Sequence, residues 1–167
     1  MSINIAKANQ GEFYPFKLTI KANNDILSGL LAKFDSDIEV EGTFVVDNDN
    51  VYIDSNLEYS IIFQCDRCLV DVKKDFSVRC MASFYMLGEE AIEGYYSYTN
   101  NLVDMTLPVQ QEIVLNLPTR VLCNQDCKGL CPVCGINLNE GSCDCNKSQN
   151  VENNTSNNPF SVLKNLK

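Results

Sequence analysis

The sequence contains no histidine. Histidine is the commonest general base in enzymes, so its absence removes the Ser-His and Cys-His pairs on which nucleophilic catalysis usually depends. The glycine-rich loops that cradle phosphate groups are missing as well. Two acidic residues stand beside cysteines, Asp66 and Asp126, and we expect them to cap the backbone or to face solvent. The sequence therefore predicts no catalytic residue and a protein that is not an enzyme.

Long hydrophobic runs are also absent. No apolar stretch approaches the roughly 18 residues that a membrane-spanning helix needs, and residues 1–14 lack the apolar core of a signal peptide. We therefore expect a cytoplasmic protein without membrane contact. Disulfides are rare in that reducing compartment, where clustered cysteines more often bind metal or carry out redox chemistry.

Basic residues are few. The 13 Lys and Arg residues are outnumbered by 22 Asp and Glu residues, which gives a formal net charge of -9. Nucleic-acid binders obtain most of their affinity by neutralising phosphates with Lys and Arg, and this chain has no basic stripe that could do so. An acidic body suits a basic protein partner better, although acidic surfaces commonly serve only solubility.

Between residues 12 and 86 the sequence is strand-like. Ile38, Val40 and Phe44 alternate with acidic or small residues, as in a half-buried strand, and residues 47–50 form a turn signal. With 167 residues and 45% hydrophobic content, the chain can bury one core and hold a small annex. The expected class is α+β, with mainly an antiparallel β meander or partial barrel, one main helix and a cysteine-rich zinc-binding annex.

The main helix is expected near residues 106–117. Thr106 is its expected N-cap, and a proline stands in the first turn. Five apolar residues form the stripe that would face the core: Leu107, Val109, Ile113, Val114 and Leu117. Residues 88–101, before this helix, predict a long loop. Its three tyrosines could stack on bases, but packing on the sheet is the favoured interpretation for Tyr95, Tyr96 and Tyr98.

The chain divides by composition into four parts. Residues 1–118 form the expected β-rich body, residues 119–145 the cysteine-rich zinc annex, and residues 146–158 a disordered, Asn-rich linker. Residues 159–167 predict a short C-terminal helix. A helix of that length is marginal alone in water, so it must dock either on the body of this chain or on a partner.

The cysteines give the strongest signal in the sequence. Six of the nine lie within residues 123–145, and two others form a second Cys-x-x-Cys pair far upstream. Structural zinc takes four ligands in a tetrahedron, and without histidine the ligands must be thiolates, which favour zinc or iron–sulfur centres over magnesium or calcium. We therefore expect two zinc sites of four cysteines each. The first comprises Cys65, Cys68, Cys123 and Cys127, and the second comprises Cys131, Cys134, Cys143 and Cys145.

Other uses of the cysteines remain open at this point. Cys80 is left over, as a small buried strand residue. A single metal site could use Cys131, Cys134 and two further cysteines, six downstream cysteines could bridge two zinc ions, or the thiols could stay reduced without metal. A rubredoxin-type iron site needs two Cys-x-x-Cys-Gly turns, and only Cys134 is followed by glycine. A redox Cys-x-x-Cys usually opens a helix, whereas Cys65 follows a strand-like stretch.

Several motifs together resemble the YceD family, also called large ribosomal RNA subunit accumulation proteins. They are QCDRCL, the helix ending in LNLP, the cysteine-rich stretch at 123–145 and the closing NPFSVLKNLK. The most specific stretch is DCKGLCPVCG at 126–135, followed by Leu138 and Asn139. The family often has Asp-Pro-Arg near the C-terminus where this chain has Asn-Pro-Phe, so no role of an arginine is carried over.

The resemblance implies a role in accumulation of the large-subunit ribosomal RNA, through processing or subunit assembly. Genes of this family commonly neighbour that of a small basic ribosomal protein, so the expected partner is a basic large-subunit protein or a pre-ribosomal particle, bound by a non-enzymatic factor. Two other functions stay open: a redox protein that uses a thiolate-bound metal, and direct RNA binding. The lysines that could contact RNA are Lys128, Lys147, Lys164 and Lys167.

Overall fold

The computed structural model describes residues 2–88, 90 and 92–145. The expected linker at 146–158 and C-terminal helix at 159–167 lie outside the described residues. Three of the four candidate RNA-binding lysines lie outside them too, namely Lys147, Lys164 and Lys167. Among the described helices, none has both the length and the apolar character that a membrane crossing requires.

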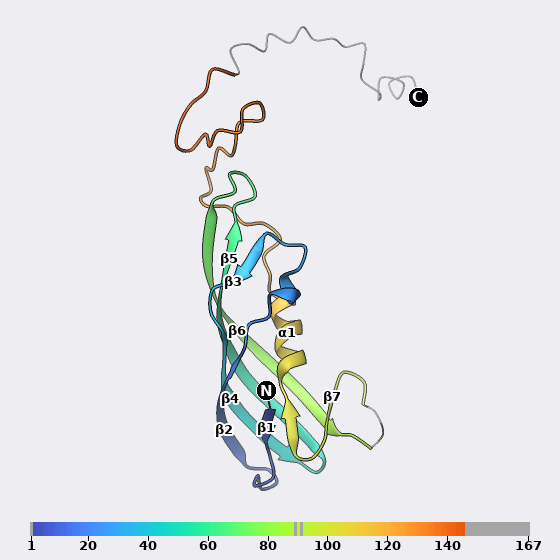
Figure 1. Ribbon diagram of the computed structural model, residues 1–167. Coiled ribbons are helices and arrows are strands. Elements are labelled where there is room, and N and C mark those ends of the chain that lie inside the picture. Colours follow the sequence, from blue (N-terminus) through green and yellow to red (C-terminus); the bar gives the residue numbers. More distant parts are fainter. Residues whose placement is uncertain (1, 89, 91, 146–167) are drawn as a thin grey trace, which may run out of the picture.

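Six strands form the main sheet, in the spatial order β2-β4-β5-β6-β7 with β3 beside β5 (Figure 1). Their bounds are β2 Phe13–Ile20, β3 Ala32–Phe34, β4 Ile38–Asp47, β5 Asn50–Gln64, β6 Asp71–Met86 and β7 Tyr96–Tyr98. All neighbours pair antiparallel except β6 and β7, which are parallel. The expected antiparallel meander is confirmed for β4, β5 and β6. The sheet is open, because no described pairing joins β2 to β7 and closes a barrel.

Three further elements complete the fold. A short 3-10 helix, η1 (Asn24–Leu27), lies between β2 and β3. A two-stranded ribbon pairs β1 (Ser2–Asn4) with β8 (Leu102–Asp104), and the α-helix α1 (Thr106–Leu115) follows β8 directly. The described part of the chain is thus mostly sheet with one α-helix, in agreement with the expected β-rich body and main helix.

The hairpin of β5 and β6 is the longest feature of the sheet. Its residue pairs run without interruption from Asn50↔Tyr85 to Gln64↔Asp71. Every second side chain of β5 is buried, from Val51 to Phe63, because successive residues of a strand point to opposite faces. We call the face that carries these buried side chains the inner face and the opposite one the outer face.

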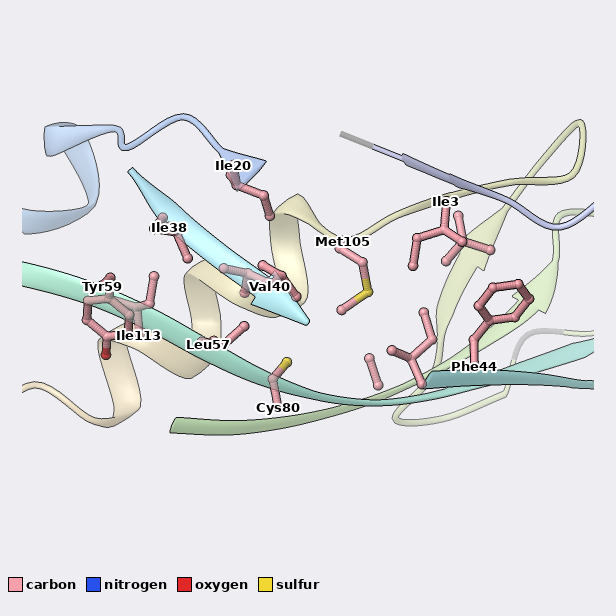
Figure 2. Close-up of a cluster of buried hydrophobic side chains, with 14 of the residues drawn as sticks. Ile3, Ile20, Ile38, Val40, Phe44, Leu57, Tyr59, Cys80, Met105 and Ile113 are labelled. Atoms are coloured by element: carbon pink, nitrogen blue, oxygen red, sulfur yellow. The ribbon is translucent and has the colours of Figure 1, made fainter. Parts of the chain in front are cut away.

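The inner face is covered by α1 and by the β1–β8 ribbon. Figure 2 shows Met105 and Ile113, from the start and the middle of the helical segment, in one cluster with Leu57 and Cys80 of the sheet. Ile3 of the ribbon belongs to the same buried cluster. The core is therefore a single apolar layer between the sheet and these elements, and the outer face has no described element over it.

The expected N-cap of α1 is wrong by one residue. Met105 occupies the N-cap position and Thr106 is the first helical residue. The carboxylate of Asp104 accepts hydrogen bonds from the Thr106 backbone N–H at 2.9 Å and from its hydroxyl at 2.6 Å. Because a negative charge is favourable at the start of a helix, Asp104 serves the capping role that was expected of the threonine.

The buried side of α1 also differs in part from the expected stripe. Val109 and Ile113 are fully buried, whereas Leu107 and Val114 are 53% and 49% exposed. The residues of this segment that pack into the core include Met105, Val109 and Ile113. They are spaced by four residues and therefore lie on one side of the helix. Leu107 and Val114 lie on another side of the helix and face outward.

At Gly42 of β4 the neighbouring strand β5 approaches very closely. Gly42 pairs with Ser55, and a β-carbon added to Gly42 would lie 2.5 Å from the Ser55 Cα and 2.7 Å from its Cβ. Ser55 is itself buried and donates its hydroxyl to the backbone oxygen of Cys80 at 3.1 Å. Small residues at these paired positions allow a close approach that a larger side chain would prevent.

We expect Gly42→Ala to destabilise the fold by about 3 kcal/mol, because the added methyl group can be accommodated only if β4 and β5 separate. The matched control is Thr43→Ala, on the exposed outer side of the same strand, where a loss of less than about 0.5 kcal/mol is expected. Denaturant unfolding measures both values. Equal, small losses for the two variants would show that the strands are not held this closely.

Candidate metal centres

Two cysteines lie in the turn that links β5 to β6. Cys65 directly follows the last residue of β5, and Cys68 lies three residues further on, before β6 begins at Asp71. After α1 the chain returns to this end of the sheet and continues beyond it (Figure 1). Asp66 fixes the return, because its backbone N–H donates to the Val121 oxygen at 2.9 Å and its carboxylate accepts from the Val121 N–H at 2.7 Å. The expected capping role of Asp66 is confirmed.

The first sulfur group contains Cys65, Cys68, Cys123 and Cys127. Its four sulfur atoms all lie within 4.8 Å of one another. The Sγ atoms of Cys65 and Cys127 are 3.8 Å apart, and those of Cys68 and Cys123 are 3.6 Å apart. Three of the four residues are buried, with Cys123 half-buried. This group joins the β5–β6 turn to a segment more than 50 residues later in the chain.

The second sulfur group contains Cys131, Cys134, Cys143 and Cys145. Its sulfur atoms also lie within 4.8 Å of one another. Cys131 is buried, Cys134 is exposed, and the other two are half-buried. This group closes a loop within the last described part of the chain and is more open to solvent than the first. The eight residues and their division into two groups are those expected from the sequence.

The Cys-x-x-Cys stretches of both groups fold into the same turn. In the second, the Gly135 N–H donates to the Cys131 oxygen at 2.9 Å, and the Cys131 N–H donates to the Ile136 oxygen at 2.8 Å. In the first, the corresponding bonds run from Leu69 to Cys65 and from Cys65 to Val70, both at 2.9 Å.

Leu69 takes the position of Gly135 in the first of these turns. It has a φ of 61°, close to the 75° of Gly135. Such a backbone conformation costs a residue with a β-carbon about 1–2 kcal/mol, which is why glycine is usual there. The missing glycine after Cys68 made the two turns look different in the sequence, although their geometry is alike.

Arg67 and Asn139, which lie outside the two cysteine sets, both hydrogen-bond to Cys127 and so support the first group. The Arg67 guanidinium donates to the backbone oxygen of Cys127 at 2.7 Å, and the Leu130 N–H donates to the Arg67 oxygen at 2.9 Å. The Asn139 amide donates to the Cys127 sulfur at 3.4 Å, and its oxygen accepts from the Lys128 N–H at 2.8 Å. Sequence analysis did not assign these roles, because neither Arg67 nor Asn139 is a metal-ligand type.

Thiol ionisation is uneven within the first group. Burial acts to raise the pKa of Cys65, but backbone N–H groups of Arg67, Cys123 and Cys68 hydrogen-bond to its sulfur and bring the pKa down to about 6. Burial and the neighbouring sulfur atoms raise the pKa of Cys123 to about 12. Burial acts to raise the pKa of Cys127 as well, but hydrogen bonds from the Asn139 amide and the Gly129 backbone lower it. Thiolates are therefore favoured at Cys65 and Cys127, while the neighbouring Cys123 stays protonated.

The second group behaves in the same way. Backbone N–H groups of Cys134 and Val133 are the main cause that lowers the pKa of Cys131 to about 6. The neighbouring Cys134 sulfur, followed by burial, raises the pKa of Cys145 to about 12. Four negative charges cannot collect within a few ångströms of one another unless a cation compensates them.

The spacing of the sulfurs fits a single ion in each group. Zinc–sulfur bonds of about 2.3 Å in a tetrahedron place the sulfurs about 3.8 Å apart. The sulfur pairs of the first group, at 3.8 and 3.6 Å, match this edge length. Each group can therefore hold one metal ion, and four thiolate donors suit zinc.

The remaining candidate residues lie elsewhere. Cys80 is buried in the core, where burial is the main cause that raises its pKa to about 11. The three tyrosines pack on the sheet, as the favoured interpretation expected. Tyr95 contacts Tyr52 edge to face, Tyr96 lies against Phe84, and Tyr98 is buried. Asp126 and Lys128 are exposed, beside the first sulfur group.

Comparison with known proteins gives one family. The family model described as "Large ribosomal RNA subunit accumulation protein YceD" matches residues 53–167, a range that begins in β5 and includes all eight clustered cysteines. No solved structure matches the chain.

Curated relatives match at low identity. An uncharacterized protein of Mycobacterium tuberculosis is 27% identical over 113 residues, which cover 64% of this chain and 52% of the relative. The "Large ribosomal RNA subunit accumulation protein YCED homolog 1, chloroplastic" of Zea mays is 30% identical over 105 residues, covering 60% of this chain and 33% of the relative. The protein of the same name in Arabidopsis thaliana is 32% identical over 47 residues, covering 28% and 15%. The chain thus spans about half the length of the mycobacterial relative and less of the plant ones.

Gly129 offers a test of the packing around the first group. It has a φ of 78°, and a β-carbon there would lie 3.0 Å from the backbone oxygen of Arg67. Gly135 has nearly the same φ, 75°, but open space around it. We expect Gly135→Ala to lower the free energy of unfolding by about 1 kcal/mol, because of the strained backbone conformation alone. Gly129→Ala should lower it by about 1 kcal/mol more, because Arg67 must also move. Thermal unfolding of the metal-loaded variants measures the difference, and equal losses would contradict the close contact.

Proposed function

Because the chain belongs to the family of large ribosomal RNA subunit accumulation proteins, we propose that it supports accumulation of the large-subunit ribosomal RNA by binding rather than by catalysis. Its partner is a basic large-subunit ribosomal protein or a pre-ribosomal particle. The observation that carries the proposal is the convergence of eight cysteine sulfurs into two tetrahedral-sized groups within the part of the chain that matches the family. Such groups stabilise a binding scaffold and leave no open coordination position for a substrate.

Zinc is the proposed metal. Cys65, Cys68, Cys123 and Cys127 would hold one ion, and Cys131, Cys134, Cys143 and Cys145 the other. A zinc ion with four thiolates contributes folding free energy, because the preformed site does not exist in the unfolded chain. The first ion would tie the segment after α1 to the β5–β6 turn, and the second would order residues 131–145.

Charge supports a basic partner. The formal net charge is -9, and each zinc ion with four thiolates would add a further -2. Electrostatic complementarity of this kind raises association rates and excludes acidic competitors such as free RNA. Eight thiolates also need a reducing compartment to stay free of disulfides, so the proposed site of action is the cytoplasm.

The metal proposal is tested by two variants with the same chemical change at equally buried positions. Cys65 and Cys80 are 0% and 1% exposed. We expect the unaltered protein to contain two zinc ions and to be colourless, Cys80→Ser to keep both, and Cys65→Ser to lose one. The loss should lower the thermal midpoint far more than the core change does, because a structural zinc contributes roughly 10 kcal/mol or more to folding. Metal analysis by mass spectrometry and an absorption spectrum give the result, and visible iron bands would contradict it.

The cellular role is tested in a strain that lacks the gene. We expect less large-subunit ribosomal RNA relative to the small-subunit RNA, with restoration by the unaltered chain and by Cys80→Ser but not by Cys65→Ser. Quantification of both RNAs on denaturing gels gives the ratio. An unchanged ratio in the deletion strain would refute the proposed function.

A further inference from the structure

The outer face of the sheet carries an exposed apolar patch at one end. We define the patch as Phe13, Val45, Tyr52 and Met81. Phe13 pairs with Val45 and Val45 with Tyr52, so three of them form one row across β2, β4 and β5. Phe13 is 73% and Met81 68% exposed, and a hollow of about 440 Å³ lies among the four residues. The solvent face of an antiparallel sheet is normally polar, so this row departs from the expected pattern.

Acidic hollows continue from the patch along the same face. A hollow of about 600 Å³ is lined by Asp37, Glu39, Glu58 and Asp75, and none of its lining residues within the described chain is basic. A smaller hollow shares Glu39 and Glu58 with it and extends towards the patch through Asn56, with Lys17 as its one basic lining residue among those described. The outer face therefore changes from apolar to acidic along its strands.

The nearby basic residues are already engaged. Lys17 lies 3.0 Å from Glu39 and 3.3 Å from Glu41. Lys21 pairs at 2.9 Å with Asp37, which lines the larger hollow, although Lys21 itself does not. Glu58 receives only a 3.5 Å hydrogen bond from the Asn56 amide. On β6, Lys73 pairs with Asp35 at 2.6 Å and lies near enough to Asp75 to attract it, and Arg79 pairs with Asp54 at 2.7 Å. A cation that entered the larger hollow would therefore meet Glu58 without displacing a lysine or arginine that pairs with it in the described chain.

We propose that the outer face is the docking surface for a basic protein segment that carries an apolar anchor side chain. The anchor occupies the patch, and Lys or Arg residues of the segment lie over the acidic hollows. Tyr52 and Glu58 are six residues apart on β5, so the anchor and the basic residues are separated by about 20 Å, or about six residues of an extended segment. The inference rests on the proposed function, because it takes the basic partner from there and adds the surface that binds it.

The chemistry of the face favours this occupant over two others. Phosphates of an RNA would approach carboxylates and lose affinity rather than gain it. A second copy of the chain could bring the acidic hollows against each other, where like charges cost several kcal/mol. It could also bring them against the apolar patch, where the carboxylates would lose water without gaining a partner. Both alternatives give distinct results in the test below.

The test uses the full zinc-loaded chain and individually purified large-subunit ribosomal proteins as probes, with deproteinised large-subunit RNA as a separate arm. The patch variant is Phe13→Ser with Met81→Ser. Its control is Leu107→Ser with Leu115→Ser, at positions that are 53% and 78% exposed on α1, across the sheet from the patch. The acidic variant is Glu39→Gln with Glu58→Gln. Circular dichroism and zinc content first establish that all variants fold.

We expect at least one basic ribosomal protein to bind, with affinity reduced about tenfold or more by the patch variant and by the acidic variant but not by the α1 control. Binding of the unaltered chain should weaken with added salt, and the acidic variant should show a smaller salt dependence. Fluorescence anisotropy gives the dissociation constants, and sedimentation gives the oligomeric state.

Four outcomes overturn the docking surface. In the first, a ribosomal protein binds all variants equally, and in the second it loses affinity only for the α1 control. In the third, RNA binds and loses affinity for the patch or acidic variant. In the fourth, the unaltered chain is a dimer that the patch variant dissociates. The first two leave the proposed function standing, because a basic partner is still bound. If no ribosomal protein binds and deletion leaves the ribosomal RNA ratio unchanged, the proposed function fails as well.

Discussion

The conformation of the chain between α1 and residue 145 depends on the two sulfur groups, in each of which four sulfur atoms lie within 4.8 Å of one another. Hydrogen bonds favour thiolates at Cys65 and Cys131, while the pKa of another thiol in each group rises to about 12. Only a cation allows all four sulfurs to ionise together, and it then draws their chain segments into one position. The first group joins Cys65 to Cys127 and so couples the sheet to the segment after α1, which has no strand or helix of its own within the described residues.

The β5–β6 hairpin gives this coupling its fixed base. Its alternating burial allows one register only, because a shift by one residue would turn Val51, Leu57 and Phe63 to solvent. Cys65 follows β5 directly, so the register of the core also sets the position of the first sulfur group. The side chains of Asp66 and Arg67 then hydrogen-bond to backbone groups of the returning chain, the Val121 N–H and the Cys127 oxygen. Cysteine sulfurs that are distant in sequence are thus brought together by ordinary sheet packing.

Much of this arrangement could be predicted from the sequence, and the failures have physical reasons. The clustering of the cysteines predicted both sulfur groups, since each group contains one Cys-x-x-Cys turn, which brings two sulfurs to one side locally, and a second pair of cysteines that are close in sequence. The turn at Leu69 was missed because a non-glycine residue tolerates the left-handed backbone there. Asn139 and Asp104 act through hydrogen bonds whose partners are set by folding, so periodicity did not reveal them. The close approach at Gly42 depends on the neighbouring strand and leaves no pattern along its own.

The two candidate binding features lie at opposite ends of one strand. Tyr52 of the apolar patch and Cys65 of the first sulfur group are 13 residues apart along β5, a distance of about 40 Å in extended chain. A segment docked in the patch cannot contact the sulfur groups unless it extends along the whole outer face. The acidic hollows lie between these ends. The sulfur groups therefore lie at the far end of the scaffold, beyond a stretch of the face that carries Lys33 and Ile62, and a partner that contacts both ends must be extended.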